Sequence, residues 1–350
     1  MKIATLTLIS LAATTVAHAQ WQAFDIHPPG GYTQSFCNMT DGTRIYGTAR
    51  KNGVTEGGYI EGGVFNSLNP AGASASGVSA LDGGAQYGAA TFNGEEHAGR
   101  WFDFAGSWQD WNPTGSTNSQ IYTAKNGKAG GYATFGGVQK ATVWNGGGKD
   151  DTTDLHDNSW ISSSVDAMDG NDIFGDAQVS AGVHNAGKWT NGAWTNLNPN
   201  GALGSQIIGA VNGTQSGWIL TANGYQASLW QGTAASQTNL ATPGFDQSVA
   251  FDLRGQYVAG TAWSGLNSHA GFWNGGAFTD LHAFVSQSFT HSAAYGVEVL
   301  GGRVYVFGEA WNTQLELHHA MVWSQPVPEP GTLLGAAPLI ALALRRKRPA

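Results

Sequence analysis

The chain has 350 residues, a net charge of −8 and only 16 Lys and Arg residues, and this scarcity of positive charge argues against nucleic acid as a partner. Its one cysteine, Cys37, excludes an internal disulfide, and we expect it to be a small buried side chain in a strand. The 51 glycines, the many Asn, Ser, Thr and Trp residues and the 11% of charged residues predict short strands joined by tight turns.

The first residues have the layout of a secretory signal. Lys2 precedes an apolar stretch over residues 3–16, and a small-residue cleavage site, Ala-His-Ala, ends at Ala19. The alternative, a buried helix, is disfavoured because the apolar stretch is too short to span a bilayer and has the flanks of a signal peptide. We therefore predict that residues 1–19 are a signal peptide and that the chain is exported.

A tryptophan motif recurs along the rest of the chain. It consists of a small residue, two variable residues and a tryptophan, and successive copies lie 41–50 residues apart, beginning with a degenerate copy at residues 57–60. We predict that the tryptophans pack between neighbouring repeats, where a large ring faces a small residue. The alternative is a set of sugar-stacking platforms. These anchors are Trp101, Trp144, Trp189, Trp230, Trp273 and Trp323.

Two further signatures recur in the same order. A polar, apolar, polar triplet follows the anchors, at residues 67–70, 110–113, 154–156, 196–199, 239–240 and 280–282, and another copy stands alone at residues 25–28. Hairpin turns are predicted at residues 41–42, 82–83, 126–127, 169–170, 212–213, 254–255 and 301–302. Five of these seven pairs are the Asn-Gly or Asp-Gly that a type I′ turn requires.

These signatures predict the fold. Each turn joins two stretches of β character, and the anchor and the triplet mark two more, which gives four strands in about 43 residues, the size of one propeller blade. We predict that residues 20–325 form an all-β, seven-bladed β-propeller of four-stranded blades. The N-terminal strand at residues 23–26 would complete the last blade, which ends at residues 320–323 without a triplet strand. An open seven-repeat solenoid, the alternative, would leave both half-units exposed.

One unit allows a family resemblance to be named. Residues 269–273 read His-Ala-Gly-Phe-Trp and are followed by Asp280 and Leu281, and residues 96–101 and 319–323 match the same pattern. The chain thus resembles HAF-type extracellular repeat proteins over its mature length. Several units lack the histidine, and Asn-Pro-x-Gly replaces the Gly-rich stretch of the family. The resemblance implies an exported or surface repeat protein and implies no enzymatic activity.

The C-terminal residues 326–350 have three parts. The motif Pro328, Glu329 and Pro330 precedes an apolar stretch over residues 333–344 and a basic end at residues 345–348. This tail resembles the PEP-CTERM sorting signal, which implies an exosortase as partner, transient membrane contact and export to the surface or matrix of a Gram-negative bacterium that makes exopolysaccharide. An ordinary single-span anchor is the alternative.

No catalytic or metal-ligating residue is predicted. Histidines occupy two repeat positions, and we expect repeat-encoded hydrogen bonds there, with a metal or acid–base cluster as the alternative. Two acidic groups leave calcium as a weaker alternative to no cofactor, although neither has the spacing of an EF-hand loop. The histidines are His27, His156 and His282, and His97, His269 and His319; the acidic groups are Asp150, Asp151, Asp154 and Asp157, and Asp166, Asp169, Asn171 and Asp172.

The sequence favours a non-enzymatic surface or matrix propeller that binds exopolysaccharide or a surface protein. Aromatic residues outside the repeat register are the better candidates for exposed binding positions. The alternative is a glycan hydrolase or lyase with a site at the central channel, which requires paired carboxylates outside the repeat register. The aromatic candidates are Trp108, Trp160, Trp218, Trp263 and Trp311, and the carboxylate candidates are Glu95, Glu96, Glu298 and Glu309.

Overall fold

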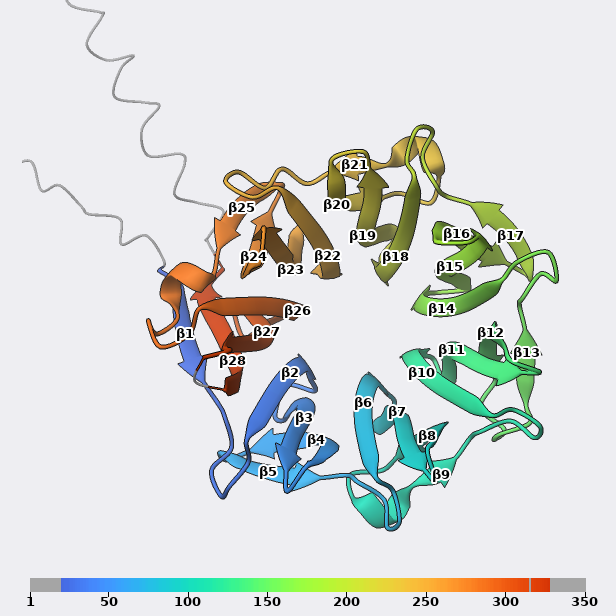
Figure 1. Ribbon diagram of the computed structural model, residues 1–350, viewed down its shortest axis with the longest axis horizontal. Helices are drawn as coiled ribbons and strands as arrows, with labels where there is room; N and C mark the ends of the chain where they lie inside the picture. The colour runs from blue at the N-terminus through green and yellow to red at the C-terminus, as the bar shows by residue number, and fades with distance from the viewer. Residues whose placement is uncertain (1–19, 315, 328–350) are drawn as a thin grey trace, which may run out of the picture.

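Seven four-stranded antiparallel sheets stand around a ring in the computed structural model of the protein (Figure 1). The structure describes residues 20–314 and 316–327, so the predicted signal peptide and the sorting motif Pro328, Glu329 and Pro330 lie outside the described residues. The predicted all-β, seven-bladed β-propeller is confirmed. Within the described residues, no helix has the length and apolar character needed to cross a membrane.

The first four blades follow one another along the chain. Blade 1 contains β2 (Gln34–Thr40), β3 (Ile45–Lys51), β4 (Val54–Glu61) and β5 (Val64–Ser67). Blade 2 contains β6 (Ala75–Asp82), β7 (Ala85–Phe92), β8 (Glu95–Trp101) and β9 (Gln109–Asp110), with η1 (Ala105–Ser107) before β9. Blade 3 contains β10 (Asn118–Lys125), β11 (Lys128–Phe135), β12 (Val138–Trp144) and β13 (Thr152–Asp154). Blade 4 contains β14 (Ser162–Asp169), β15 (Asp172–Ser180), β16 (Val183–Thr190) and β17 (Ala193–Asn196).

The last three blades complete the ring. Blade 5 contains β18 (Gly204–Val211), β19 (Thr214–Thr221), β20 (Gly224–Trp230) and β21 (Thr238–Asn239), with η2 (Ala234–Ser236) before β21. Blade 6 contains β22 (Gln247–Arg254), β23 (Tyr257–Ser264), β24 (Asn267–Asn274) and β25 (Ala277–Asp280), and η3 (His282–Phe284) follows it. Blade 7 contains β26 (His291–Leu300), β27 (Arg303–Asn312), β28 (Leu317–Pro326) and β1 (Gln22–Asp25).

The two ends of the chain close the ring, as predicted. The N-terminal strand β1 pairs antiparallel with β28, with Gln22 opposite Ser324 and Asp25 opposite Met321. Figure 1 shows β1 beside β28 at the outer edge of the last blade. The edge that the last blade would otherwise expose is therefore covered by the start of the chain.

A buried serine joins each blade to the next. Near the start of every innermost strand, its hydroxyl oxygen accepts a backbone N–H from the third strand of the preceding blade, at 2.9–3.1 Å. At the closure, Ser35 of blade 1 accepts the N–H of Ala320 of blade 7. All seven junctions therefore have the same bond, through Ser35, Ser76, Ser119, Ser163, Ser205, Ser248 and Ser292.

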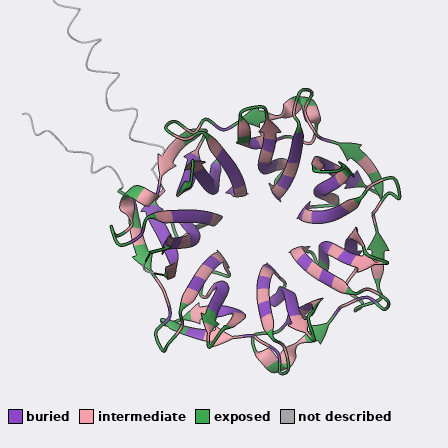
Figure 2. Ribbon diagram, in the orientation of Figure 1, coloured by how far each residue is buried: buried purple, intermediate pink, exposed green. Residues whose placement is uncertain are grey.

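The repeated tryptophans lie between blades. All six are at most 1% exposed, and burial of each stabilises the fold by about 3 kcal/mol. Five also donate the indole N–H to a backbone carbonyl of the preceding blade, as Trp144 does to Trp111 at 2.9 Å and Trp323 to Leu281 at 3.0 Å. Buried residues gather in the inner strands of each blade, and exposed residues in the outer strands and loops (Figure 2).

The predicted hairpin turns need a correction. Residues 126–127, 212–213 and 301–302 form two-residue turns with positive φ at both positions. Asp82, Asp169 and Arg254, in contrast, are the last residues of their strands, and the turns begin one residue later. In each case the glycine takes the first turn position with a positive φ, which suits a turn that needs glycine there. Residues 41–42 lie in a longer connection between Thr40 and Ile45. The carboxylates of Asp82 and Asp169 each accept a backbone N–H from the hairpin of the next blade, from Gly127 and Gly213 respectively, both at 2.6 Å.

Every innermost strand carries a β-bulge, and a glycine faces it from the second strand. A Cβ atom on any of these glycines would lie 1.8–2.0 Å from a carbonyl oxygen of the bulged strand, so the bulge and the glycine require each other. The glycines are Gly47, Gly88, Gly131, Gly175, Gly217, Gly260 and Gly308. The bulged residues are Asn38, Ser79, Tyr122, Asp166, Ile208, Phe251 and Tyr295.

Blade 2 offers a matched test of this requirement. A Cβ on Gly88 would meet the Gly77 carbonyl oxygen at 2.0 Å, whereas a Cβ on Gly77 itself would have no atom within 4 Å. We expect Gly88→Ala to lower the free energy of unfolding by about 3 kcal/mol. Gly77→Ala should be neutral or slightly stabilising. Urea denaturation of the purified variants measures both, and equal midpoints would contradict the account.

Candidate functional site: the central channel

A cavity of about 1260 Å³ runs along the innermost strands at the centre of the ring. One end is lined by hairpin residues that include Asp82 and Lys125, and the other by residues of blades 4 and 5 that include His184 and Tyr225. All seven bulged residues line it. A bulge re-aims a side chain, so the same backbone feature in each blade presents one residue to the channel.

The residues at these bulges differ in chemistry from one part of the ring to another. Blades 1–4 present Asn38, Ser79, Tyr122 and Asp166, which all carry polar groups, whereas blades 5 and 6 present Ile208 and Phe251. Blade 7 presents Tyr295. The bulged residues therefore differ in polarity around the ring.

Two carboxyl groups meet in blade 4. The Ser164 hydroxyl oxygen lies 2.9 Å from one oxygen of Asp166 and 2.9 Å from one oxygen of Asp176. The second oxygen of Asp176 contacts Nδ1 of His184, and Gln206 donates to the second oxygen of Asp166 at 2.9 Å. A hydroxyl group has one hydrogen, so both serine contacts are hydrogen bonds only when one carboxyl group carries a proton.

The pKa shifts in this group agree with the presence of one proton on the two carboxyl groups. Burial and, to a smaller extent, the neighbouring Asp176 carboxylate raise the pKa of Asp166 above its ordinary value. The hydrogen bond with Asp176 raises the pKa of His184. The arrangement thus favours a proton on Asp166, next to the contact between Asp176 and His184.

Aromatic rings line two parts of the cavity. Tyr295 lies 5.9 Å from Phe36 and 5.6 Å from Phe251 between ring centroids, and we call these three residues the aromatic wall. On the other side, Trp218 packs against Tyr225 at 4.9 Å and donates its indole N–H to Gln206 at 3.2 Å. Ser164, Asp166, Asp176, His184, Gln206 and Trp218 are the polar wall.

Comparison with known proteins shows the fold and nothing finer. No protein-family model matches the chain, and no curated protein does. The structure of YCF48 bound to D1 peptide is similar over 92% of this chain and 99% of that one, with 14% identity and a TM-score of 0.50. The β-propeller domain of the Trilobed protease from Pyrococcus furiosus is similar over 88% and 99%, with 8% identity and a TM-score of 0.56. By fold, this chain is a β-propeller.

The histidines of both repeat positions lie at the blade junctions of the propeller, and none of the six lines the cavity. The Nδ1 atoms of His27, His156 and His282 contact the junction serines at 2.7–2.9 Å. The Nδ1 atoms of His97, His269 and His319 contact Asp110, Asp280 and Asp25 at 2.7–2.8 Å. These are repeat-encoded hydrogen bonds, and they do not bring the histidines together as one cluster.

The acidic residues considered for calcium are engaged separately. Asp150 accepts from Thr114, Asp151 from Gly147, and Asp157 from Ser159, while Lys140 donates to Asp154. In the second group, Asp169 bonds to Gly213, Asp172 to Thr190, and Asp166 lies in the channel. Among the described residues, no group of three or more His, Cys, Asp or Glu side chains is placed to hold a metal ion.

The carboxylate pair of the channel is not the one that sequence reasoning selected. Glu298 and Glu309 line the cavity, but Glu298 pairs with Arg254 at 3.0 Å and Glu309 accepts from Tyr295 at 2.7 Å. Glu96 accepts from Tyr132, and Glu95 is exposed. Asp166 was named only as a calcium candidate and Asp176 was missed, although the residue type at the bulge position of Asp166 varies around the ring.

The aromatic candidates outside the repeat register and Cys37 lie in different parts of the blades. Of the aromatic residues outside the repeat register, Trp218 lines the cavity, whereas Trp108 packs on the anchor Trp101 at 4.4 Å and Trp160 on Trp194 at 4.9 Å. Trp311 stacks with His291 and His318, and Trp263 lies near Tyr225. Cys37 is a buried residue of β2, and burial raises the pKa of its thiol to about 12.

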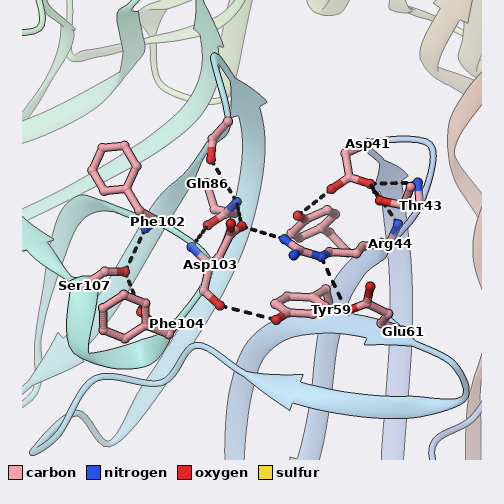
Figure 3. A network of polar contacts seen from close by, with 12 residues as sticks. Asp41, Thr43, Arg44, Tyr59, Glu61, Gln86, Phe102, Asp103, Phe104 and Ser107 are labelled. Carbon is pink, nitrogen blue, oxygen red and sulfur yellow. Dashed lines mark hydrogen bonds and ion pairs between the residues drawn. The ribbon is translucent and has the colours of Figure 1, made fainter.

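A second cavity, of about 380 Å³, lies between blades 1 and 2 beside a polar network (Figure 3). Arg44 donates to Asp103 at 2.6 Å, pairs with Glu61 and stacks over the Tyr59 ring at 4.6 Å. Asp103 has a φ of 68°, a left-handed conformation that costs a non-glycine residue about 1 kcal/mol. The Arg44 guanidinium is thus already paired, and the network joins two blades.

The histidines at the blade junctions predict that the folded protein loses stability in acid. The Ser292 hydroxyl oxygen accepts the Ala270 N–H and also contacts Nδ1 of His282 at 2.9 Å. Burial, then the charge of stacked His269, lowers the pKa of His282 to about 4. Because the unfolded chain takes up this proton near pH 6.5 and the folded chain does not, stability falls as the pH drops from 6.5 towards 4.

Replacing His282 by Asn removes that proton but keeps an acceptor for the serine, as Asn112 and Asn198 do in two other blades. We expect the variant to match the wild type at pH 7 and to lose less stability between pH 6.5 and pH 4.5. Urea midpoints across this range measure the difference. Parallel pH profiles for the two proteins would show that His282 is not responsible.

Proposed function

We propose that this chain is an exported, non-enzymatic surface or matrix propeller that binds a polysaccharide in its central channel. The observation that carries the proposal is the convergence of aromatic, carboxyl and amide side chains from different blades on one cavity. These side chains occupy positions that recur in the blades, but their residue types do not recur with the repeat. A purely structural ring would have no need of different side chains at equivalent positions.

The side chains suit a sugar ligand. The flat faces of Trp218 and Tyr225 offer stacking surfaces, and Gln206 and Asp166 offer hydrogen-bonding groups for hydroxyls. The cavity has room for several sugar units. YCF48, which is similar in fold, has been solved bound to D1 peptide, and a surface protein is therefore the second ligand class.

Export and sorting are part of the proposal. The signal-like residues 1–19 and the tail at residues 326–350 support export to the surface or matrix of a Gram-negative bacterium, with an exosortase as partner and transient membrane contact. The intact mass of the exported protein tests this. We expect a chain that begins near Gln20 and lacks the residues after the Pro328-Glu329-Pro330 motif. An exported protein that retains Ala350 would favour a single-span anchor instead.

One observation favours a second candidate, a glycan hydrolase. The carboxyl oxygens of Asp166 and Asp176 that contact Ser164 are at most twice 2.9 Å apart, and retaining glycosidases hold two carboxyl groups about 5–5.5 Å apart. The raised pKa of Asp166 suits a general acid. Asp176 is less suited as a nucleophile because it is buried and both of its oxygens are already bonded.

One experiment separates the two candidates. We expect the purified protein to bind the exopolysaccharide of the producing bacterium saturably, and Trp218→Ala to weaken binding about tenfold, or about 1.4 kcal/mol. Trp311→Ala, at an aromatic residue outside the cavity, should bind as the wild type does. The same mixtures are assayed for new reducing ends. Turnover that Asp166→Asn abolishes would replace binding by hydrolysis, and absence of binding and turnover would reject both.

A further inference from the structure

Aromatic side chains continue from the mouth of the channel onto the next blade. Tyr225 lines the cavity, is 36% exposed, and has its ring centroid 4.9 Å from that of Trp218, which also lines the cavity. The Tyr225 ring lies 6.2 Å from that of Trp263 in blade 6, which is outside the cavity lining. These three rings form a continuous row that begins in the channel and ends outside it, and we call this row the aromatic track.

The aromatic track is not part of the repeat. The position of Tyr225 on the third strand holds Thr55 in blade 1 and Ser268 in blade 6. The position of Trp263 on the second strand holds Thr91 in blade 2. The blades therefore form without an aromatic residue at either place, and the framework does not explain the two rings.

Blade 7 shows what a tryptophan with covered faces looks like at the same position. Trp311 corresponds to Trp263, since each is the second-strand partner of the first residue of the innermost strand. The Trp311 ring is stacked between the rings of His291 and His318, its partners on the two neighbouring strands, at interplanar angles of 9° and 2°. Both faces of Trp311 are thus occupied by side chains of its own blade.

The neighbours of Trp263 leave its ring more accessible. Its partners on the two adjacent strands are Gln247 and Ser268, and neither has a ring. The Gln247 side chain is directed towards blade 5, where its amide oxygen accepts the backbone N–H of Tyr225 at 3.0 Å. A sugar can therefore approach the Trp263 ring where imidazole rings cover Trp311, and an aromatic face is a suitable stacking surface for it.

The surface around most of the aromatic track is uncharged. Residues 189–245, which include all of blade 5, contain no Asp, Glu, Lys, Arg or His. A charged ligand group placed against this surface would lose hydration without gaining a counter-charge, which is unfavourable. In the channel, the acidic residues Asp166 and Asp176 disfavour an anionic ligand. The site therefore favours an uncharged chain.

We propose that the bound polysaccharide is an uncharged chain that leaves the channel along the aromatic track, so that the binding site extends beyond the cavity onto blade 6. This inference rests on the proposed polysaccharide-binding function and adds the charge class of the ligand and the path that it takes. Trp218 contacts the part of the chain inside the channel, and Trp263 contacts the part outside it. A short fragment reaches only the first of these two residues.

Two size classes of one ligand test the path. The exopolysaccharide of the producing bacterium is hydrolysed, and tetrasaccharides, which the cavity can hold whole, are separated from dodecasaccharides, which must extend beyond it. Calorimetric titration of the purified full-length protein gives both affinities. A long chain also offers more binding positions, so variants and not the size difference alone carry the test. Raising NaCl from about 50 mM to about 500 mM should change either affinity by less than about twofold.

Substitutions found at the same position of other blades keep the sheet intact. Trp263→Thr, which copies Thr91 of blade 2, should weaken the binding of dodecasaccharides about tenfold and leave that of tetrasaccharides unchanged. Trp263→Leu, which copies Leu220 of blade 5 and keeps apolar bulk, should have the same effect. Trp218→Ala should weaken both fragments. Trp311→Thr is the matched control and should change neither, and thermal unfolding verifies that each variant is folded.

The contrary outcomes are distinct. If replacement of Trp263 weakens both fragments equally, or neither, the path along the aromatic track is wrong and binding in the channel stands. If added salt weakens binding tenfold or more, charges carry the interaction and the ligand is not an uncharged chain. If the intact exopolysaccharide binds but neither fragment does, the inference is again overturned. Failure of the intact exopolysaccharide to bind would reject the proposed function itself.

Discussion

The ring depends on a hydrogen bond that occurs at all seven blade junctions, from a backbone N–H of one blade to the serine hydroxyl of the next. Each such N–H is buried, so loss of its acceptor would cost more than the bond itself contributes. At the closure the same bond joins Ala320 to Ser35, and Nδ1 of His27 contacts this serine as His156 and His282 contact theirs elsewhere. The seam between the two ends of the chain therefore resembles the other six junctions in its bonding.

The bulges separate the framework of the channel from its lining. A glycine on the second strand accommodates each bulge, and the backbone then presents one side chain to the channel whatever that side chain is. Asp166 and Ile208 occupy equivalent positions in neighbouring blades, so the fold tolerates a carboxyl group and an alkyl group at the same place. A ligand site can change here without a change in the strands that support it.

The sequence predicted the features that repeat and missed the features that vary. The tryptophan anchors and the triplets are long-range periodic signals, and they were enough for the number of blades and for the closure by β1. The glycines that face the bulges recur in the same way and would have strengthened the prediction. The pairing of Asp166 with Asp176 was out of reach, because it depends on strand register across β14 and β15, and a shift of one residue reverses the face on which a side chain lies. The turns predicted at Asp82, Asp169 and Arg254 were placed one residue early, because the glycine that follows each residue takes the first turn position.

The fold does not require an acidic residue at the position of Asp176. Burial of a carboxylate is expensive, even when it is paired, and removal of such a pair often leaves a fold as stable or more stable. Equivalent positions on the second strands of three other blades hold Thr48, Ala89 and Thr261, so the propeller does not need an acid there. The framework of the propeller therefore does not require the carboxyl pair. An acid whose pKa is raised by burial in a cavity is typical of functional sites, and Asp166 is such an acid at a position where other blades have neutral side chains.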